Sequence, residues 1–200
     1  MRVVMRMRRA ERNREVVLAA ARQVFLDKGY AGATLEGIAE AAGFSKGVVY
    51  SQFESKADLF LTLLKRRIDE RSAQNERVAE RSSGAEGIRE LVQIAARDAT
   101  AERGWAALLV EFRSHAGRDP ALNARYAQAH GRTLEELAGV LARMHDRGGL
   151  VPKVTPRSMA EFILAFASGI TLERSAASGA LPDGDGTVMV LRALGLPDLP

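Results

Sequence analysis

The 200-residue sequence predicts an all-α protein, in which a three-helix unit is joined by one long helix to a larger helical part. Apolar residues recur every three or four positions through most of the chain, which is the period of a helix with one buried face. No segment alternates apolar and polar residues for long enough to predict a strand. Three helix starts fall close together within residues 34–59. We therefore expect helices throughout, with the shortest ones concentrated in this stretch.

The three helix starts carry residues that cap helices. Thr34, Ser45 and Ser55 can each accept hydrogen bonds from backbone N–H groups that the first helical turn leaves unpaired. Ser55 is followed three residues later by Asp58, as in a capping box. Gly43 suits the end of the first of these helices, where φ is often positive. Helix, tight turn, short helix and long helix in this order predict a helix-turn-helix, whose second helix enters the major groove of DNA.

Breaker residues and apolar stripes delimit the other helices. Gly29 ends a first helix, Ser82-Ser83-Gly84 ends the long one, and Gly148-Gly149 and Pro156 bound later ones. Besides the helix between Thr34 and Gly43, helices are predicted over residues 11–28, 46–52, 55–81, 85–101, 105–114, 121–147 and 156–178, with a last short one within 187–194.

The long helix over residues 55–81 changes character along its length. Its first half carries a buried-type stripe that includes Phe60 and Leu64, and it becomes polar beyond Asp69. A helix whose halves belong to different cores connects two domains. We therefore divide the chain into a DNA-binding domain over residues 11–71 and a helical domain over residues 72–200. Residues 1–10 carry four arginines and no acid, and we expect a disordered basic arm. The arm either follows phosphates and the minor groove of DNA or has no role.

Composition limits the class of protein. There is no cysteine, which excludes disulfides and thiolate metal sites, and no apolar run approaches the roughly 20 residues that span a bilayer. Residues 1–71 hold fourteen Lys/Arg against nine Asp/Glu, a balance of +5, whereas residues 72–200 hold fifteen against sixteen, a balance of −1. An uneven surface by chance would explain so small an excess, but a polyanionic partner at the first end explains it more simply. These features predict a soluble cytoplasmic protein without a membrane partner.

A series of residues, in order and without gaps, extends the helix-turn-helix pattern. It consists of Phe25, Gly29, Thr34, Ile38, Ala39, Ala42, Gly43, Ser45, Lys46, Gly47, Tyr50, Phe53, Ser55, Lys56 and Leu59. This series resembles the TetR family of bacterial transcriptional repressors. The resemblance covers residues 11–71, about a third of the chain, and the remainder resembles the family only in its helical character.

The resemblance implies how the second helix reads DNA. Thr34, Tyr50 and Lys56 match positions that contact the DNA backbone in TetR-like repressors. By the same analogy, the residues around 46–52 face base edges or nearby phosphates. Ser51-Gln52 stands here in place of the aromatic–His pair that usually follows the tyrosine in the family. Taken alone, Tyr50 is better explained as a half-buried core tyrosine, whereas within this series of residues DNA contact is favoured. The predicted DNA-binding residues are Thr34, Ser45, Lys46, Gly47, Val48, Tyr50, Ser51, Gln52 and Lys56.

The resemblance also implies that the larger part binds a ligand and forms a dimer. A small apolar or aromatic molecule would lie among the middle helices, although each candidate residue is also compatible with a solid core. The candidate lining is Trp105, Leu109, Phe112, Tyr126, His130, Leu134, Met144 and Phe162. The candidate dimer interface is Met159, Phe166, Gly169 and Ile170, and these residues are equally compatible with an intramolecular core.

No pattern of catalytic or metal-ligating residues stands out, so we expect no enzyme, metal or cofactor. His130 and His145 are fifteen residues apart, which on one helix corresponds to roughly 22 Å. The leading hypothesis is a homodimeric repressor that a small effector releases from a palindromic operator in double-stranded DNA. The alternatives are a helix-turn-helix regulator without a small-molecule ligand and a helical binding protein that has lost DNA binding.

Overall fold

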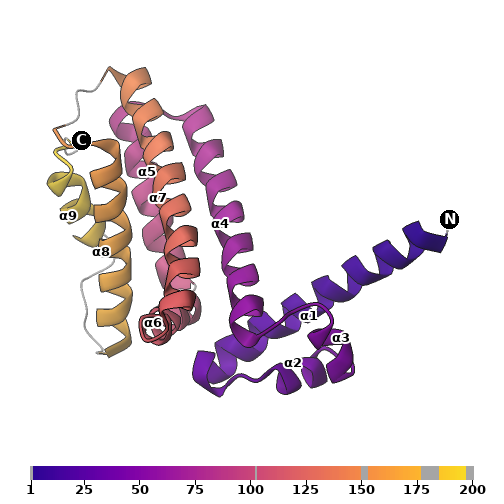
Figure 1. Ribbon diagram of the computed structural model, residues 1–200. Helices are drawn as coiled ribbons and strands as arrows, with labels where there is room; N and C mark the ends of the chain where they lie inside the picture. Colours follow the sequence, from indigo (N-terminus) through magenta and orange to yellow (C-terminus); the bar gives the residue numbers. More distant parts are fainter. Residues whose placement is uncertain (1, 102, 150–152, 177–184, 197–200) are drawn as a thin grey trace.

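The computed structural model describes residues 2–101, 103–149, 153–176 and 185–196. Within these ranges the chain forms helices and no strand, and the expected all-α fold is confirmed (Figure 1). The helices are α1 Arg2–Gly32, α2 Leu35–Ala41, α3 Lys46–Tyr50, α4 Lys56–Arg81, α5 Gly84–Ala101, α6 Arg103–Ala116, α7 Pro120–Gly148, α8 Pro156–Ala176 and α9 Asp185–Ala193.

The predicted caps lie where α2, α3 and α4 begin. Thr34 Oγ1 accepts a hydrogen bond from Gly37 N at 3.0 Å, and Ser55 Oγ accepts one from Asp58 N at 3.0 Å. Ser45 has the extended backbone of a cap, but its hydroxyl makes no capping hydrogen bond. The three helix starts are thus confirmed, and the Ser45 side chain stays available for another contact.

Helix α1 begins earlier than the sequence suggested. Residues 2–10, which we expected to be disordered, continue the same helix, and it projects beyond α2 and α3 (Figure 1). The stretch before Gly29 contains neither Gly nor Pro and is rich in Arg, Met, Leu and Ala, so adding residues to an existing helix is favourable. Gly29 interrupts the helix with φ 69° and ψ 173°. The side chains of residues 1–7 lie outside the described part of the structure.

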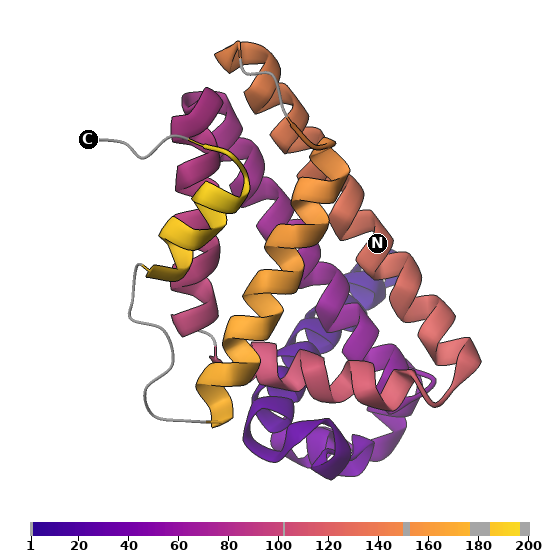
Figure 2. The same ribbon diagram turned by 90° about the vertical axis from the view of Figure 1, so that its left-hand side faces the viewer.

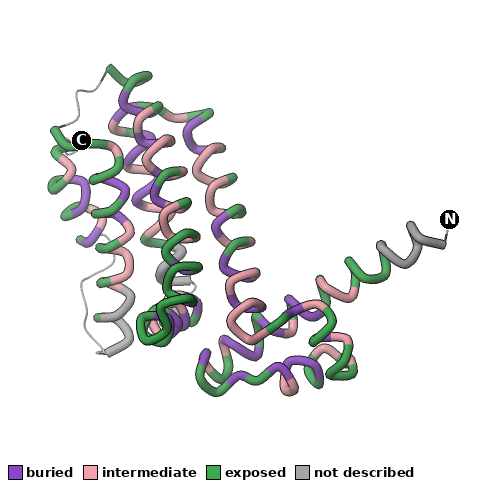
Figure 3. Tube along the Cα trace, in the orientation of Figure 1, coloured by how far each residue is buried: buried purple, intermediate pink, exposed green. Residues whose placement is uncertain are grey.

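Two clusters of buried side chains organise the molecule, and α4 contributes to both (Figure 3). We call the first the head cluster. It contains the buried side chains of α1 to α3 and of the first half of α4, and it also includes Trp105, Leu108, Phe112 and Ala116 of α6 and Leu122 and Tyr126 of α7. The second, the body cluster, joins the end of α4 to α5, α7, α8 and α9. The packing of α6 onto the head was not predicted.

The body is a helical bundle in which α7 packs against α4, α5, α6 and α8, while α9 packs on α5 and α8. Helix α6 lies at the end of this bundle nearest α1 and contacts α1, α5, α7 and α8 (Figures 1 and 2). It therefore lies between the head and the bundle. No helix among the described residues is both long and apolar enough to span a bilayer.

Candidate DNA-binding face and ligand cavity

Helix α3 exposes most of the residues predicted to contact DNA. Ser45, Lys46, Gly47, Tyr50 and Ser51 are exposed, as is Thr34 at the start of α2, and Val48 is half-buried. The exposed fractions are 67% for the Lys46 side chain and 50% for Tyr50. Val49 is fully buried in the head cluster and fixes the rotation of α3. Most of the predicted residues are therefore exposed around α3 and the start of α2.

An acidic residue of α2 lies beside this face. The Tyr50 hydroxyl donates to Glu36 Oε1 at 2.8 Å, and Lys46 Nζ lies 4.0 Å from the same oxygen. Hydrogen bonds from its own backbone N–H and from the Tyr50 hydroxyl lower the pKa of Glu36, and the second of these bonds raises the pKa of Tyr50. Glu36 thus fixes the position of the Tyr50 hydroxyl and places a negative charge beside Lys46.

Gln52 turns toward its own helix. Its Nε2 donates to Val48 O at 3.1 Å, and its Oε1 is buried with no partner among the described residues. Arg14 donates to Gln52 O at 3.1 Å and lies 4.4 Å above the Phe53 ring, which packs α1 over this end of α3. The structure therefore does not place the Gln52 amide on the exposed face with the other predicted residues.

Lys56 is engaged by the chain itself. Its Nζ donates to Tyr30 O at 2.7 Å, Ala31 O at 3.3 Å and Ala33 O at 2.9 Å, which uses all three ammonium hydrogens. The same atom lies 4.6 Å from the centre of the Tyr30 ring. Partial burial lowers the pKa of Lys56, against the opposing charge of Glu111. Lys56 thus stabilises residues 29–34, which comprise the last turn of α1 beyond the kink at Gly29 and the link to α2; we call this segment the α1–α2 connection. A phosphate contact would displace one of these hydrogen bonds.

Glu111 of α6 binds the other side of this connection, and the sequence did not single it out. Its Oε2 accepts from Tyr30 N at 2.9 Å and its Oε1 from Ala31 N at 2.8 Å. Gly29 has a positive φ of 69°, which favours glycine, and a Cβ there would lie 2.7 Å from Glu111 Oε2 and displace this carboxylate. The only sequence signal was an acid within the apolar run Leu-Leu-Val-Glu-Phe.

The body contains a cavity of about 230 Å³ between α4, α5, α6, α7 and α8. Two of the eight predicted lining residues, Trp105 and Leu109, line this cavity. Its lining consists of Arg67, Arg71, Asn75, Leu91, Ala95, Trp105, Ala106, Leu109, Val110, Arg113, Thr133, Leu137, Ile163, Leu164, Ala167 and Ser168. Sequence analysis missed the arginines because they lie in polar stretches that resemble a solvated helix face.

The other six predicted lining residues lie elsewhere. Phe112 and Tyr126 are buried in the head cluster, and His130 stacks on Tyr126 with ring centroids 5.9 Å apart. Leu134 and Met144 are buried in the body cluster. Phe162 is 40% exposed on the surface of α8. Aromatic and apolar residues at helical spacing therefore fill the solid core here more often than they line the cavity.

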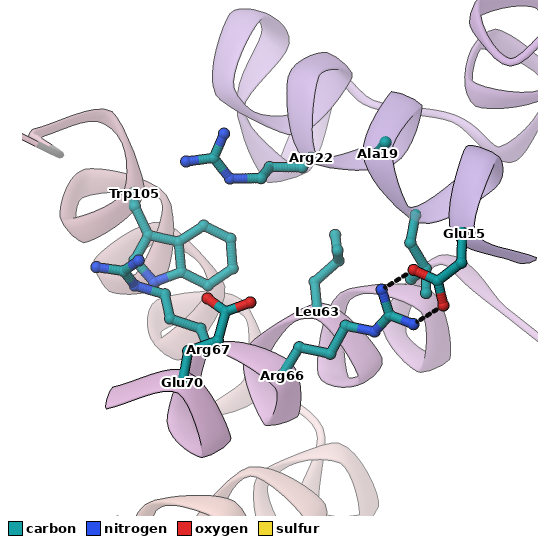
Figure 4. A pocket seen from close by; sticks show the side chains of 9 residues that line it. Glu15, Ala19, Arg22, Leu63, Arg66, Arg67, Glu70 and Trp105 are labelled. Carbon is teal, nitrogen blue, oxygen red and sulfur yellow. Dashed lines mark hydrogen bonds and ion pairs between the residues drawn. The ribbon is translucent and has the colours of Figure 1, made fainter. Parts of the chain in front are cut away.

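A second cavity of about 180 Å³ lies between α1 and α4 and is shown in Figure 4. Arg66 of α4 forms a paired contact with Glu15 of α1, in which Arg66 Nη1 lies 2.6 Å from Glu15 Oε2. The hydrogen bond from Arg66 lowers the pKa of Glu15. Arg67 and Trp105 line both cavities, and the Arg67 guanidinium lies 5.5 Å from the Trp105 ring centre. These two side chains therefore separate the cavity in the body from the space beside the head.

The predicted dimer residues do not share one environment. Met159 is buried in the body cluster, Phe166 and Ile170 are half-buried, and Gly169 is exposed. A Cβ at Gly169 would meet no described atom within 4 Å, so the surface there is open to close approach. Phe162 on α8 and Val188 and Met189 on α9 are apolar side chains that remain exposed.

Comparison with known proteins identifies both parts of the chain. Residues 17–63 match the family model described as bacterial regulatory proteins, tetR family, and residues 84–195 match that of the BetI-type transcriptional repressor, C-terminal. The transcriptional repressor AcnR of Corynebacterium glutamicum is 27% identical over 180 residues, which are 90% of this chain and 89% of AcnR.

Other relatives are similar over shorter regions or in fold alone. The transcriptional activator FasR of Mycolicibacterium smegmatis is 44% identical over 64 residues, which are 32% of this chain and 29% of FasR. The crystal structure of FadR from Bacillus subtilis in complex with stearoyl-CoA has a TM-score of 0.70 at 17% identity, and the match covers 90% of this chain and 95% of FadR.

The match over residues 84–195 spans more than half of the chain, and the match over residues 17–63 contains the exposed helix α3 and its supporting core. The chain therefore belongs to the TetR family of bacterial transcriptional regulators.

Proposed function

We propose that this regulator is a homodimeric repressor that binds a palindromic operator and is released from it by a small ligand in the body cavity. The observation that carries the proposal is the exposed face of α3, with Lys46 and Tyr50 projecting from a helix that Val49 anchors in the core. It acts by binding DNA, not by catalysis, and it works in the cytoplasm where its DNA lies.

The α8 and α9 surface supports the dimer. Phe162, Val188 and Met189 expose apolar area that a second copy would cover, and Gly169 lets two helices approach closely. Two copies would present two α3 helices to successive major grooves, about 34–36 Å apart or slightly more on one side of the duplex. The domain division at residue 71 and a phosphate-following role for the amino-terminal end of α1 belong to the same proposal.

The position of α6 supports the ligand switch. One side of α6 lines the cavity through Leu109 and Arg113, and the other holds the α1–α2 connection through Glu111. A ligand that favours a different position of α6 or α4 would change the spacing of the two reading helices. To relieve repression strongly it must bind the released state more tightly by a few kcal/mol.

The experiment that tests the proposal is selection of genomic fragments by the full chain, followed by titration of the best fragment at several salt concentrations. Lys46→Gln should lower the slope of log affinity against log salt by about one, because one phosphate contact is lost. Lys153→Gln, an exposed lysine of the body, is the matched control and should leave the slope unchanged. If no fragment is enriched, or if both variants behave as the wild type, the α3 face is not the DNA-binding surface.

A further inference from the structure

Glu36 lies in the first turn of α2, where this helix meets α3 at the end of the head away from the bundle (Figure 1). Its neighbours Leu35 and Ile38 are buried in the head cluster, and they fix the rotation of α2. The Glu36 side chain itself is 43% exposed. The hydrogen bonds that lower its pKa keep the carboxylate ionised at neutral pH. A negative charge therefore stands at a fixed place beside the exposed residues of α3.

The Tyr50 hydroxyl and the Lys46 ammonium both lie next to one oxygen of this carboxylate. Tyr50 donates to Glu36 Oε1 at 2.8 Å, and Lys46 Nζ lies 4.0 Å from the same oxygen. Lys46 and Tyr50 are four residues apart, so both project from one side of α3. A DNA atom at a hydrogen-bond distance of about 3 Å from either side chain would lie within roughly 7 Å of Glu36 Oε1. Glu36 therefore belongs to the DNA interface whenever Lys46 or Tyr50 does.

The chemistry of a carboxylate limits what Glu36 can contact on DNA. An ionised carboxylate only accepts hydrogen bonds, and it repels the phosphates. The donors that bases present in the major groove are the amino groups N4 of cytosine and N6 of adenine. On adenine, N6 lies beside the acceptor N7, which opposes a carboxylate, whereas cytosine presents the N4 amino group alone. Cytosine is therefore the base that suits Glu36.

We propose that Glu36 is a specificity-determining residue that accepts a hydrogen bond from N4 of a cytosine in each half of the operator. The inference rests on the proposed function and extends base recognition from α3 to α2. Tyr50 holds the carboxylate in place, and Lys46 beside it offsets the negative charge while it binds a phosphate. DNA without cytosine at this position leaves the carboxylate facing acceptors, so the protein binds it more weakly.

Selection by the full chain from duplexes randomised within its enriched operator fragment tests the base. The wild type should require cytosine at one position in each half-site. Glu36→Gln keeps the shape of the side chain but replaces the carboxylate by an amide, which pairs with N6 and N7 of adenine. Its preference at that position should move from cytosine to adenine. Glu40→Gln removes an exposed acid of the same helix, and as the matched control it should select the same bases as the wild type.

A modified base tests the hydrogen bond itself. N4-methylcytosine still pairs with guanine, but it carries a methyl group in place of the N4 hydrogen that faces the major groove. Methylation of the selected cytosine should weaken wild-type binding by at least about fivefold, the lower end of the usual loss for one mismatched base pair. Glu36→Ala has no acceptor at this place, so methylation should change its affinity by no more than about twofold. Gel-shift titration measures all four affinities.

Two results would overturn the inference. If Glu36→Gln and Glu36→Ala select the same bases as the wild type, Glu36 contacts no base. If both variants instead bind every sequence more tightly by the same factor, Glu36 only opposes the phosphates. In either case the wild type still selects an operator, so the DNA-binding proposal stands and this inference alone is lost. A wild type that enriches no fragment would remove both proposals.

Discussion

Helix α6 has two sides that differ in packing and chemistry. Toward the head, Leu108 and Phe112 are nearly or fully buried, and Phe112 stacks on Phe60 with ring centroids 4.2 Å apart. Toward the bundle, Leu109 and Arg113 line a cavity whose lining is mostly apolar. The first side is a close-packed junction, and the second faces a cavity. We therefore expect a displacement of α6 to shift the head as well, because the close-packed side chains between them leave no space to accommodate it.

The largest expected effect comes from removing a ring on the packed side. Phe112→Ala should lower the free energy of unfolding by about 3–5 kcal/mol, because it leaves a hole at the centre of the junction. Leu109→Ala on the cavity side is the matched comparison, and it should cost about 1 kcal/mol since part of the side chain faces space already. Urea unfolding followed by circular dichroism measures both. Equal losses would mean that the two sides of α6 are packed alike.

The next effect concerns the lysine that stabilises the junction. Lys56→Met removes three hydrogen bonds to carbonyls of the α1–α2 connection and should cost about 2–3 kcal/mol, measured in the same way without DNA. Lys65→Met changes an exposed lysine of the same helix and should be within about 0.5 kcal/mol of the wild type. A Lys56→Met protein as stable as the control would instead leave phosphate contact as the main role of Lys56.

A smaller loss is expected for the acid that joins α6 to the head. Glu111→Gln keeps the shape of the side chain, but one of the two acceptors for Tyr30 N and Ala31 N becomes an N–H₂ group. We expect a loss of about 1–2 kcal/mol and faster hydrogen exchange at those two amides. Glu161→Gln, an exposed acid of α8, is the control. Unchanged exchange at Tyr30 and Ala31 would show that Glu111 does not hold the connection.

The sequence predicted the local structure around α2, α3 and the start of α4 better than the cavity, for a physical reason. Caps and turns are local, so Thr34, Gly43 and Ser55 can be identified without knowing what packs around them. The roles of Lys56 and Glu111 depend on contacts with residues at least 23 positions away, which no local pattern contains. Gln52 also could not be oriented from spacing, because its amide returns to Val48 O.

The cavity was harder to predict, because aromatic residues that fill the core and aromatic residues that line a cavity recur with the same helical period. Phe112 and Trp105 differ only in what lies opposite them, and that depends on how α6 crosses the bundle. The arginines of α4 resemble a solvated face until the fold encloses them. The start of α1 was missed because a basic segment without a partner satisfies the usual pattern of a disordered end, although it also propagates a helix well.

The smallest predicted effect concerns His130 of α7, which stacks on Tyr126 of the head cluster and whose pKa is influenced by Arg113 of α6. Partial burial, and then the nearby charge of Arg113, lowers the pKa of His130 below its ordinary value of 6.5, against the opposing charge of Glu161. The folded protein therefore binds fewer protons at His130 than the unfolded chain does once the pH falls below about 6.5. The stability that neutral His130 permits is complete above that pH and is lost on acidification.

His130→Gln should accordingly lose less stability than the wild type between pH 7.5 and pH 5.5 in urea unfolding. Proton NMR of the imidazole sharpens the comparison, because Arg113→Gln removes the cationic neighbour on the cavity side and should move the pKa of His130 back toward its ordinary value. Arg113 also lies 5.7 Å from the centre of the Tyr126 ring on which His130 stacks, so the Tyr126 ring signals in the same spectra check that the stack is retained. A pKa that does not respond to Arg113→Gln would mean that burial alone lowers the pKa of His130 and that the charge of Arg113 has no effect on it.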